Sequence, residues 1–267
     1  MHRIQHEQMV YYQFEQFAPF GELVHGVFTR LGGLSAEPFQ SLNVGLTVGD
    51  SVEHVQGNRQ RVASALGFSD DDACTTWQVH GSDVIVQRKR GPQSWPPPRA
   101  DAIITAERDL PLTMRFADCV PIVLFDPVKQ VVGIAHAGWR GMLAGVGPAT
   151  VRTMSAAFGS QPGDLIAGIG PSIGPCCYEV GPEVVEQVEA VFGGLDGLVT
   201  RPSTNGHNPH LDLWAANARL LAEVGVGHIE VSGLCTASMT HEFFSHRAEK
   251  GQTGRFAAAV MLRGKAA

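Results

Sequence analysis

Three short segments of this 267-residue chain place a histidine or a cysteine close to glycine or another small residue. They read Gln78-Val79-His80-Gly81, Ala117-Asp118-Cys119 and Ala135-His136-Ala137-Gly138. Two imidazoles and one thiolate form a ligand set that suits zinc, and three protein ligands leave a fourth position for water or substrate. These residue types indicate a reactive metal centre, provided that the fold brings the three side chains together.

The segments around Cys119 and His136 predict a β-hairpin. Two apolar runs of strand length, 121–125 and 131–135, flank residues 126–129, which are polar and contain proline. A turn at the centre of 126–129 would place Cys119 directly opposite His136, with Cβ atoms about 4.5–5.5 Å apart. A slip of one residue would turn one side chain to the other face. The spacing does not predict how His80 approaches this pair.

The same residues permit other chemistries. A cysteine beside a histidine is a candidate nucleophile, because the imidazole lowers the pKa of the thiol. Cys119 with His136 as its base would make a cysteine hydrolase without a metal. Two histidines and one cysteine also match a blue-copper site by ligand type. A multicopper oxidase, however, needs many more imidazoles in paired motifs, and the chain contains no His-x-His motif.

Composition and motifs exclude several classes of function. A net charge of −6 argues against nonspecific binding of nucleic acid. No apolar run reaches the roughly 18 residues that a membrane span needs, and the first residues lack the apolar core of a signal peptide. Five cysteines do not suggest a disulfide framework, so we expect a reduced, cytoplasmic protein. The sequence has no dinucleotide-binding, ATP-binding or serine-hydrolase glycine motif.

The hydrophobic pattern predicts a mixed α/β protein with much antiparallel pairing, in which helices cover the sheets. We expect helices over 52–66, 141–158, 181–192 and 213–224. We expect strands over 23–29, 75–79, 84–87, 102–105, 112–116, 121–125, 131–135, 165–169, 229–232 and 256–262. Strict alternation of strand and helix is absent. Two stretches, 91–98 and 201–209, are rich in residues that break helices and strands, but neither reads as a linker between domains.

The chain resembles the YfiH-type family, also described as laccase-domain polyphenol oxidases, purine nucleoside phosphorylases and peptidoglycan editing factor-like proteins. The matching segments run almost from end to end, and include Trp77-Gln78-Val79-His80-Gly81, Ala100-Asp101-Ala102, Ala117-Asp118-Cys119-Val120-Pro121, His136-Ala137-Gly138-Trp139-Arg140-Gly141, Gly170-Pro171-Ser172-Ile173-Gly174 and Gly254-Arg255. The resemblance implies an α/β (α+β) layered sandwich of mixed β-sheets flanked by helices, in a single domain over 1–267. One departure is Ser245-His246-Arg247-Ala248, where the family commonly has Ser-Tyr-Arg-Arg.

The resemblance also implies an activity. It implies that His80, Cys119 and His136 bind zinc and form the catalytic centre of a purine nucleoside phosphorylase. The substrates would be adenosine, inosine, guanosine or methylthioadenosine with inorganic phosphate, and the products a free base and ribose 1-phosphate. Adenosine deamination would accompany this reaction, although the motif of known zinc nucleobase deaminases is missing. The alternatives are a cysteine-type hydrolase that edits cell-wall precursors and a copper-dependent polyphenol oxidase.

Phosphorolysis needs groups that hold inorganic phosphate. The planar fork of arginine binds phosphate through two hydrogen bonds. Our candidates are Arg30 and Arg59, with Asn43 supplying a neutral amide contact. Arg140 serves either as a further phosphate ligand or as a structural arginine whose glycine neighbours permit close backbone approach. We expect a monomer or weak dimer that contacts neither nucleic acid nor membrane.

Overall fold

Two β-sheets form the centre of the computed structural model, which describes residues 1–88, 96–200 and 208–264. The five-stranded sheet has the order β1 (His2–His6), β2 (Met9–Gln13), β3 (Leu23–Phe28), β13 (Phe256–Leu262), β6 (Leu112–Phe116). The six-stranded sheet has the order β12 (His228–Val231), β9 (Ile166–Ile169), β7 (Val120–Asp126), β8 (Val131–Ala137), β5 (Ala102–Thr105), β4 (Val84–Val86). A small ribbon joins β10 (Val199–Thr200) to β11 (His210–Leu211).

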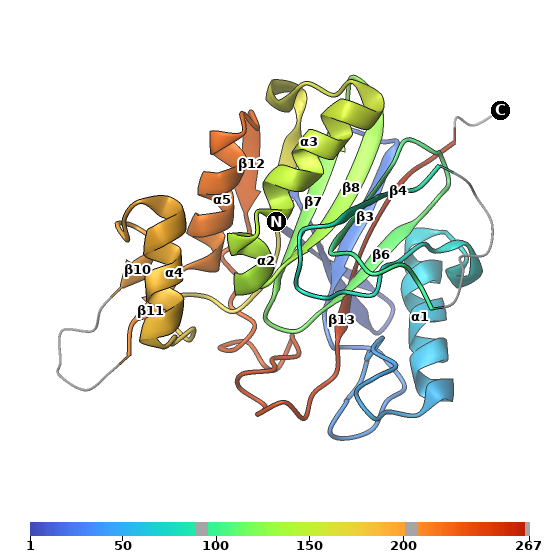
Figure 1. Cartoon of the computed structure of the whole chain (residues 1–267). Coiled ribbons are helices and arrows are strands. Elements are labelled where there is room, and N and C mark those ends of the chain that lie inside the picture. Colours follow the sequence, from blue (N-terminus) through green and yellow to red (C-terminus); the bar gives the residue numbers. More distant parts are fainter. Residues whose placement is uncertain (89–95, 201–207, 265–267) are drawn as a thin grey trace.

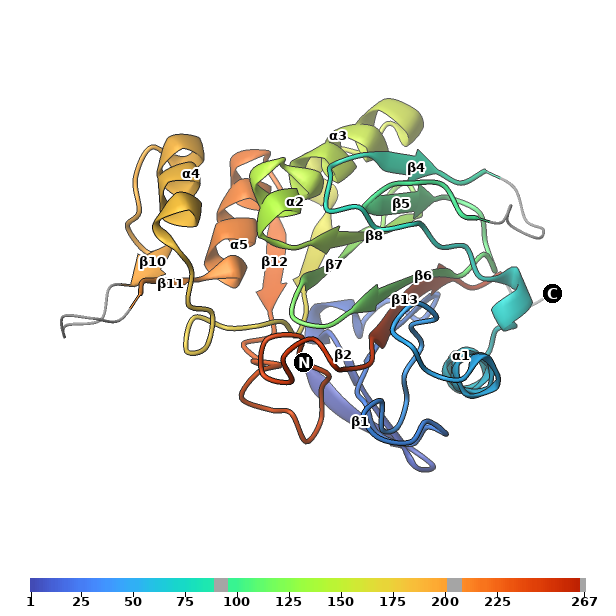
Figure 2. The same cartoon turned by 60° about the horizontal axis from the view of Figure 1, so that its bottom comes forward.

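Helices cover the outer faces of both sheets (Figures 1 and 2). Helix α1 (Val52–Leu66) packs on the five-stranded sheet. The six-stranded sheet is covered by α2 (Trp139–Leu143), α3 (Val146–Phe158) and α5 (Leu213–Glu223), and α4 (Pro182–Phe192) packs beside α2. This arrangement confirms the predicted sandwich of mixed sheets flanked by helices. No helix among the described residues is long and apolar enough to cross a membrane.

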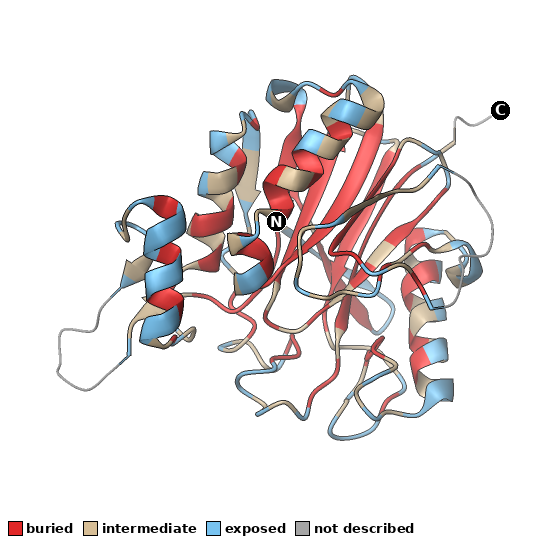
Figure 3. Ribbon diagram, viewed as in Figure 1, coloured by how far each residue is buried: buried red, intermediate tan, exposed pale blue. Residues whose placement is uncertain are grey.

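The central strands β7 and β8 are buried at every position, and they are apolar except at Asp126 and His136 because both of their faces are covered (Figure 3). On β7, Ile122 and Leu124 face the helices, whereas Val123 and Phe125 face the other sheet. Strand β13 divides its side chains in the same way between the space between the sheets and the face under α1. Burial on both faces fixes the pleat of these strands, and with it the direction in which the residues at their ends point.

Most of the predicted elements are present, and the differences have local causes. The predicted helix 141–158 is two helices, α2 and α3, because Gly145 between them has a φ of +76°. The predicted strand 75–79 is an irregular segment that makes only single bridges, at Cys74 and Trp77. The hairpin of β1 and β2 was not predicted.

The predicted β7–β8 hairpin exists, but its register differs from the prediction. His136 lies opposite Pro121 and not opposite Cys119. The turn occupies 127–130 because the Asp126 carboxylate accepts hydrogen bonds from two backbone N–H groups of the turn, both at 2.8 Å. Since the difference is two residues, it leaves Cys119 and Pro121 on the same side of the strand. Cys119 is thus a diagonal neighbour of His136.

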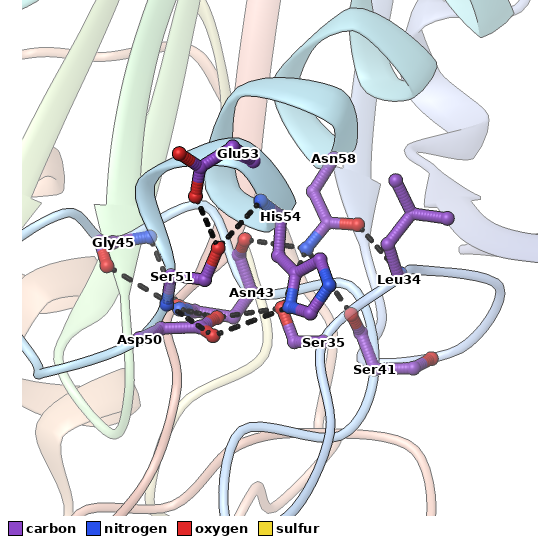
Figure 4. A network of polar contacts seen from close by, with 10 residues as sticks. All are labelled: Leu34, Ser35, Ser41, Asn43, Gly45, Asp50, Ser51, Glu53, His54 and Asn58. Carbon is purple, nitrogen blue, oxygen red and sulfur yellow. Dashed lines mark hydrogen bonds and ion pairs between the residues drawn. The ribbon is translucent and has the colours of Figure 1, made fainter.

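A buried polar network ties the start of α1 to the loop between β3 and α1 (Figure 4). The amide of Asn58 is fully buried, donates to Asn43 O at 2.8 Å and to Ser35 Oγ at 2.9 Å, and accepts from Leu34 N at 2.8 Å. Because a loop has no sheet or helix to pair its own backbone, these bonds fix its path.

We predict that Asn58→Ala lowers the free energy of unfolding by about 3 kcal/mol, because it leaves buried loop groups without partners. Urea denaturation measures the effect. Gln56→Ala, at an exposed position of the same helix, is the matched control and should change stability little. Equal unfolding midpoints for the two variants would contradict this account of the loop.

Candidate metal centre and the adjoining anion pocket

The three predicted metal ligands converge. The ligand atoms of His80, Cys119 and His136 all lie within 4.8 Å of one another, and the two imidazole centroids are 4.9 Å apart. A tetrahedral zinc with bonds of about 2.0–2.3 Å separates its ligands by roughly 3.3–3.8 Å, so small side-chain movements suffice to bind one. His136 is buried, Cys119 is partly buried and His80 is exposed. The open side of the group therefore faces solvent.

One carboxylate organises two of these three residues. Asp101 is fully buried, and its Oδ1 accepts hydrogen bonds from the His136 ring Nδ1 at 2.8 Å and the His80 backbone N–H at 2.9 Å. Its Oδ2 accepts from the N–H groups of Gly81 at 2.7 Å and Val79 at 3.1 Å. The bond to Nδ1 leaves Nε2 of His136 for the metal, an arrangement typical of histidine ligands. Asp101 lies in the family segment Ala100-Asp101-Ala102, which by itself does not predict this role.

The backbone at the centre leaves little room for larger residues. His80 has a φ of +60°, the left-handed conformation, which directs its N–H to Asp101. A Cβ at position 138 would lie 2.8 Å from Sγ of Cys119 and 3.0 Å from Nδ1 of His80. Gly138 is therefore required by the ligand atoms themselves, which explains the glycine beside the predicted histidine ligand.

Without a cation, the ligands form an ion pair. Burial alone would raise the pKa of Cys119, but the charge and hydrogen bond of His136 and a hydrogen bond from His80 lower it to about 6. Burial opposes protonation of His136, whereas Cys119 and Asp101 raise its pKa to about 9. A thiolate is the form in which cysteine binds a metal or attacks a substrate. The second imidazole, His80, is surplus to a cysteine nucleophile with one base but completes a set of three metal ligands.

A pocket of about 560 Å³ opens onto this centre, within the size range of small-molecule sites. His80, Cys119 and His136 form part of its wall. Four further aromatic side chains line it, namely Trp77, Trp139, Tyr178 and His246. Five arginines line it as well, namely Arg59, Arg115, Arg140, Arg247 and Arg255. In a chain with a net charge of −6, this concentration of arginine gives the pocket a local positive charge that favours the binding of an anion.

Three of the arginines are held by backbone carbonyls and not by carboxylates. Arg59 Nε donates to Val44 O at 3.1 Å, Arg115 Nη2 to Thr76 O at 2.7 Å, and Arg255 Nη1 to Gly254 O at 2.8 Å. None of the three forms a salt bridge with another described residue. Burial lowers their pKa values, that of Arg115 to about 10 with a contribution from the nearby charge of Arg59. The charge of Asp70 acts on Arg59 and that of Asp118 on Arg255, but neither carboxylate forms a salt bridge with them. Partly buried guanidinium groups without a salt-bridge partner favour the binding of an anion.

The structure places two of our four phosphate candidates away from this pocket. Arg30 forms a salt bridge of 2.8 Å with Glu249 and stacks on Phe244, with its guanidinium carbon 4.5 Å from the ring centroid. Asn43 is fully buried, and its Oδ1 accepts from the backbone N–H groups of Gly45 and Arg255. Asn43 thus positions two residues that do line the pocket but does not line it itself. Sequence spacing could not separate these structural roles from ligand contacts.

The other candidates and the family departure lie at the pocket. Arg59 and Arg140 line it, and Arg140 stacks on Trp139 with its guanidinium carbon 4.2 Å from the ring centroid. His246, at which the sequence departs from the family pattern, lines it too, and so does Arg247, which matches that pattern. Arg115 and Arg255 also line the pocket, but they were not predicted from the sequence. The family segment Gly254-Arg255 was the available signal for the second, whereas nothing in the pattern around Arg115 distinguished it from an ordinary strand residue.

The position of Asp118 differs from the prediction. Strand alternation predicts that Asp118 points away from Cys119. Asp118 instead has a φ of +78°, so the strand pattern does not apply to it, and its carboxylate lies at the pocket wall. It accepts hydrogen bonds from Thr236 Oγ1 at 2.7 Å and from the Arg247 N–H at 2.6 Å. Asp118 therefore anchors the C-terminal segment that closes one side of the pocket.

Comparisons with known proteins agree with this picture. A family model described as multi-copper polyphenol oxidoreductase laccase matches residues 24–263. The chain is 39% identical over 253 residues to purine nucleoside phosphorylase YlmD of Geobacillus stearothermophilus, a match that covers 92% of each chain. It is 39% identical over 245 residues to a purine nucleoside phosphorylase of Deinococcus radiodurans, which covers 92% of this chain and 91% of that one.

Solved structures share the whole fold. The crystal structure of YlmD from Geobacillus stearothermophilus aligns with a TM-score of 0.89 at 36% identity and covers 98% of this chain and 99% of that chain. A hypothetical protein YfiH from Bacillus licheniformis aligns with a TM-score of 0.88 at 34% identity, covering 97% and 98%. The similarity therefore extends to every layer of the sandwich.

We predict that Asp101→Asn lowers zinc affinity by about 10- to 100-fold, the range seen when the partner of a histidine ligand is lost. The reason is that the amide cannot accept all four hydrogen bonds that orient His136 and the segment carrying His80. Competition with a chromophoric chelator measures the affinity. Asp50→Asn, in the network around Asn43, is a control of the same chemistry away from the centre. Unchanged affinity in Asp101→Asn would contradict the assigned role.

Gly138→Ala should displace Cys119 and His80, because the added methyl would occupy space that their ligand atoms need. We expect the purified variant to lose most of its bound metal while melting as a folded protein. Elemental analysis and thermal denaturation provide the two readings. Gly163→Ala, where a Cβ would meet nothing within 4 Å, is the matched control and should keep its metal. Full metal content in Gly138→Ala would rule out this placement of the ligands.

Proposed function

The chain belongs to the family described as multi-copper polyphenol oxidoreductase laccase, and on that premise we propose that it is a zinc-dependent purine nucleoside phosphorylase. The observation that carries the proposal is a single pocket that joins three metal ligands to five arginines. Relatives named as purine nucleoside phosphorylases align with about nine-tenths of the chain. A nucleoside and inorganic phosphate are reactants of matching chemistry, since one offers an aromatic base and the other an anion.

We propose that phosphate binds among Arg59, Arg115 and Arg255. Phosphorolysis brings a dianion to the anomeric carbon of the ribose while positive charge develops on the sugar. Guanidinium groups that are fixed before the reaction hold the phosphate in position and offset its charge, without reorganising during the step. The backbone carbonyls that hold these side chains supply that rigidity. This set revises our expectation from the sequence, in which Arg30 and Asn43 accompanied Arg59.

We propose that the purine lies against the aromatic side chains that line the pocket. Trp77 lines the pocket and is 41% exposed, which is a large fraction for a tryptophan. A ligand in the pocket would cover this surface. Tyr178 keeps its proton at neutral pH because burial raises its pKa to about 12, so its hydroxyl can donate a hydrogen bond to a base nitrogen. Flat aromatic surface beside a polar donor is the usual way in which proteins hold a base.

Zinc held by His80, Cys119 and His136 would supply a Lewis acid and lower the pKa of a bound water toward about 7. On that chemistry we propose adenosine deamination as a companion reaction of the same pocket. The chain's own contribution is to fix the three ligands through Asp101 and to leave the exposed side open to the substrate. Copper binds the same ligand types. A multicopper centre, however, needs more imidazoles than the two that this group contains.

Product analysis with a panel of nucleosides tests the proposal. The zinc-loaded protein should convert inosine or adenosine to the free base and ribose 1-phosphate, and only when inorganic phosphate is present. Mass spectrometry of the products distinguishes the reaction classes. Plain ribose formed without phosphate would indicate hydrolysis, and oxidised phenols formed with oxygen uptake would indicate an oxidase. Undiminished turnover after complete removal of metal would favour Cys119 as a nucleophile.

We predict that Arg115→Gln raises the KM for phosphate by about 10- to 100-fold, because hydrogen bonds to charged groups contribute about 1.5–3 kcal/mol. The KM for the nucleoside should change much less. Steady-state kinetics with each reactant varied in turn separates the two constants. Arg30→Gln is the matched control, since it removes a guanidinium that pairs with Glu249 outside the pocket. An equal rise in the KM for phosphate in both variants would contradict the assigned anion site.

A further inference from the structure

A second group of ligand atoms lies outside the pocket lining. The Sγ atoms of Cys176, Cys177 and Cys235 all lie within 4.8 Å of one another, and those of Cys176 and Cys177 are 3.5 Å apart. None of the three residues lines the pocket described above. From the sequence, Cys235 reads as a core residue and the adjacent pair as a structural turn. Three thiols at one point need a different explanation, because a packed core does not require sulfur to meet sulfur.

The topology brings these cysteines together. Strands β9 and β12 are parallel neighbours, so the segments that follow them leave the sheet at the same edge. Those segments stay paired beyond the strands, since Ser172 N–H donates to Leu234 O at 3.2 Å and Thr236 N–H donates to Ser172 O at 3.0 Å. A turn then carries Cys176 and Cys177 back over Cys235, with the N–H of Cys177 donating to Gly174 O at 3.0 Å.

Gly174 permits the close approach of the two segments. A Cβ at this position would lie 2.5 Å from the ring of Trp214 and 3.2 Å from the Cβ of Cys235. The N–H of Gly174 donates to Sγ of Cys235 at 3.2 Å. Sulfur is a weak acceptor as a thiol and a stronger one as a thiolate, so this bond favours the anionic form that binds a cation.

We propose that Cys176, Cys177 and Cys235 form a binding site for Cu(I), separate from the zinc centre. Thiolates are soft ligands that select Cu(I), zinc and iron–sulfur clusters. Structural zinc takes four protein ligands, whereas this group of described residues ends at three, which suits a trigonal cation. A trigonal site with metal–sulfur bonds of roughly 2.3 Å, the length in zinc thiolates, separates its sulfurs by roughly 4 Å. The observed upper bound of 4.8 Å accommodates that spacing.

The burial of the three thiols supplies a path for the ion. Cys235 is buried, Cys177 is partly buried and Cys176 is exposed. An incoming cation therefore meets an accessible sulfur first and a buried one last. Bound Cu(I) would cross-link the turn at 174–178 to the segment after β12. Because Tyr178 is the last residue of this turn and lines the pocket, the cation would also hold one wall of the pocket in place.

Titration with Cu(I) tests the site. The reduced, zinc-loaded protein is titrated without oxygen against a chromophoric Cu(I) chelator, and X-ray absorption at the copper edge gives the ligands. Cys176→Ser removes an exposed thiol and therefore leaves the fold intact. Cys74→Ser removes a buried thiol elsewhere and is the matched control. Cys119→Ser removes the zinc centre's only sulfur, so copper that it still holds through sulfur belongs to the second group.

Wild type, Cys74→Ser and Cys119→Ser should each bind one Cu(I) with three sulfur ligands. In Cys176→Ser the affinity should fall at least about tenfold, which corresponds to about 1.4 kcal/mol, and the sulfur count should fall to two. Equal affinity in wild type and Cys176→Ser would overturn the proposal. So would nitrogen ligation of copper in Cys119→Ser, or displacement of the copper by excess zinc. None of these outcomes depends on the proposed phosphorylase activity.

Discussion

The carboxylate of Asp101 is the interaction on which the candidate site depends. It lies directly before β5, is fully buried, and accepts four hydrogen bonds. Burial alone would raise its pKa, but the bonds from His136 and from the backbone of Gly81 and Val79 lower it, so the group stays ionised. A buried charge is tolerated only with such partners. Here the partners are the two segments that carry the imidazoles. The hydrogen bonds that offset the cost of burying the charge therefore also hold the imidazoles in position.

The residues that line the pocket come from both sides of the sandwich. The metal ligands belong to the six-stranded side, since Cys119 precedes β7 and His136 lies in β8. The three arginines held by carbonyls belong to the other side, with Arg115 in β6, Arg255 just before β13 and Arg59 in α1. The pocket thus lies between the two sheets, and its lining contains the three candidate metal ligands from one side and the three arginines from the other. Successive side chains of the central strands point alternately to the helices and to the other sheet, which keeps both sides in register.

Much of the fold could be predicted because hydrophobic periodicity is a local signal. The helix over 52–66 and the strands over 102–105, 112–116 and 256–262 match the structure to the residue. The positions of turns were harder to predict from the sequence. The side chain of Asp126 moves the β7–β8 turn along the chain, and Gly145 divides one predicted helix into two. The observed register differs from the predicted one by two residues. Because this number is even, Cys119 and His136 still lie on the same face of the hairpin.

The rest of the site depends on contacts between distant segments, which no spacing encodes. The sequence does not distinguish Arg30 from Arg59. In the structure Arg30 contacts Glu249 and Phe244, whereas Arg59 lines the pocket. Asp101 could not be singled out, since its partners lie 20 to 35 residues away in the sequence. The grouping of Cys176 and Cys177 with Cys235 needed the pairing of β9 with β12.

X-ray absorption at the zinc edge measures whether His80, Cys119 and His136 together hold one zinc ion. We expect one sulfur, two imidazole nitrogens and one light ligand in the resting protein, with only the light ligand changing when nucleoside and phosphate are added. A catalytically active protein whose zinc has no sulfur ligand, or that contains no metal at all, would contradict this assignment.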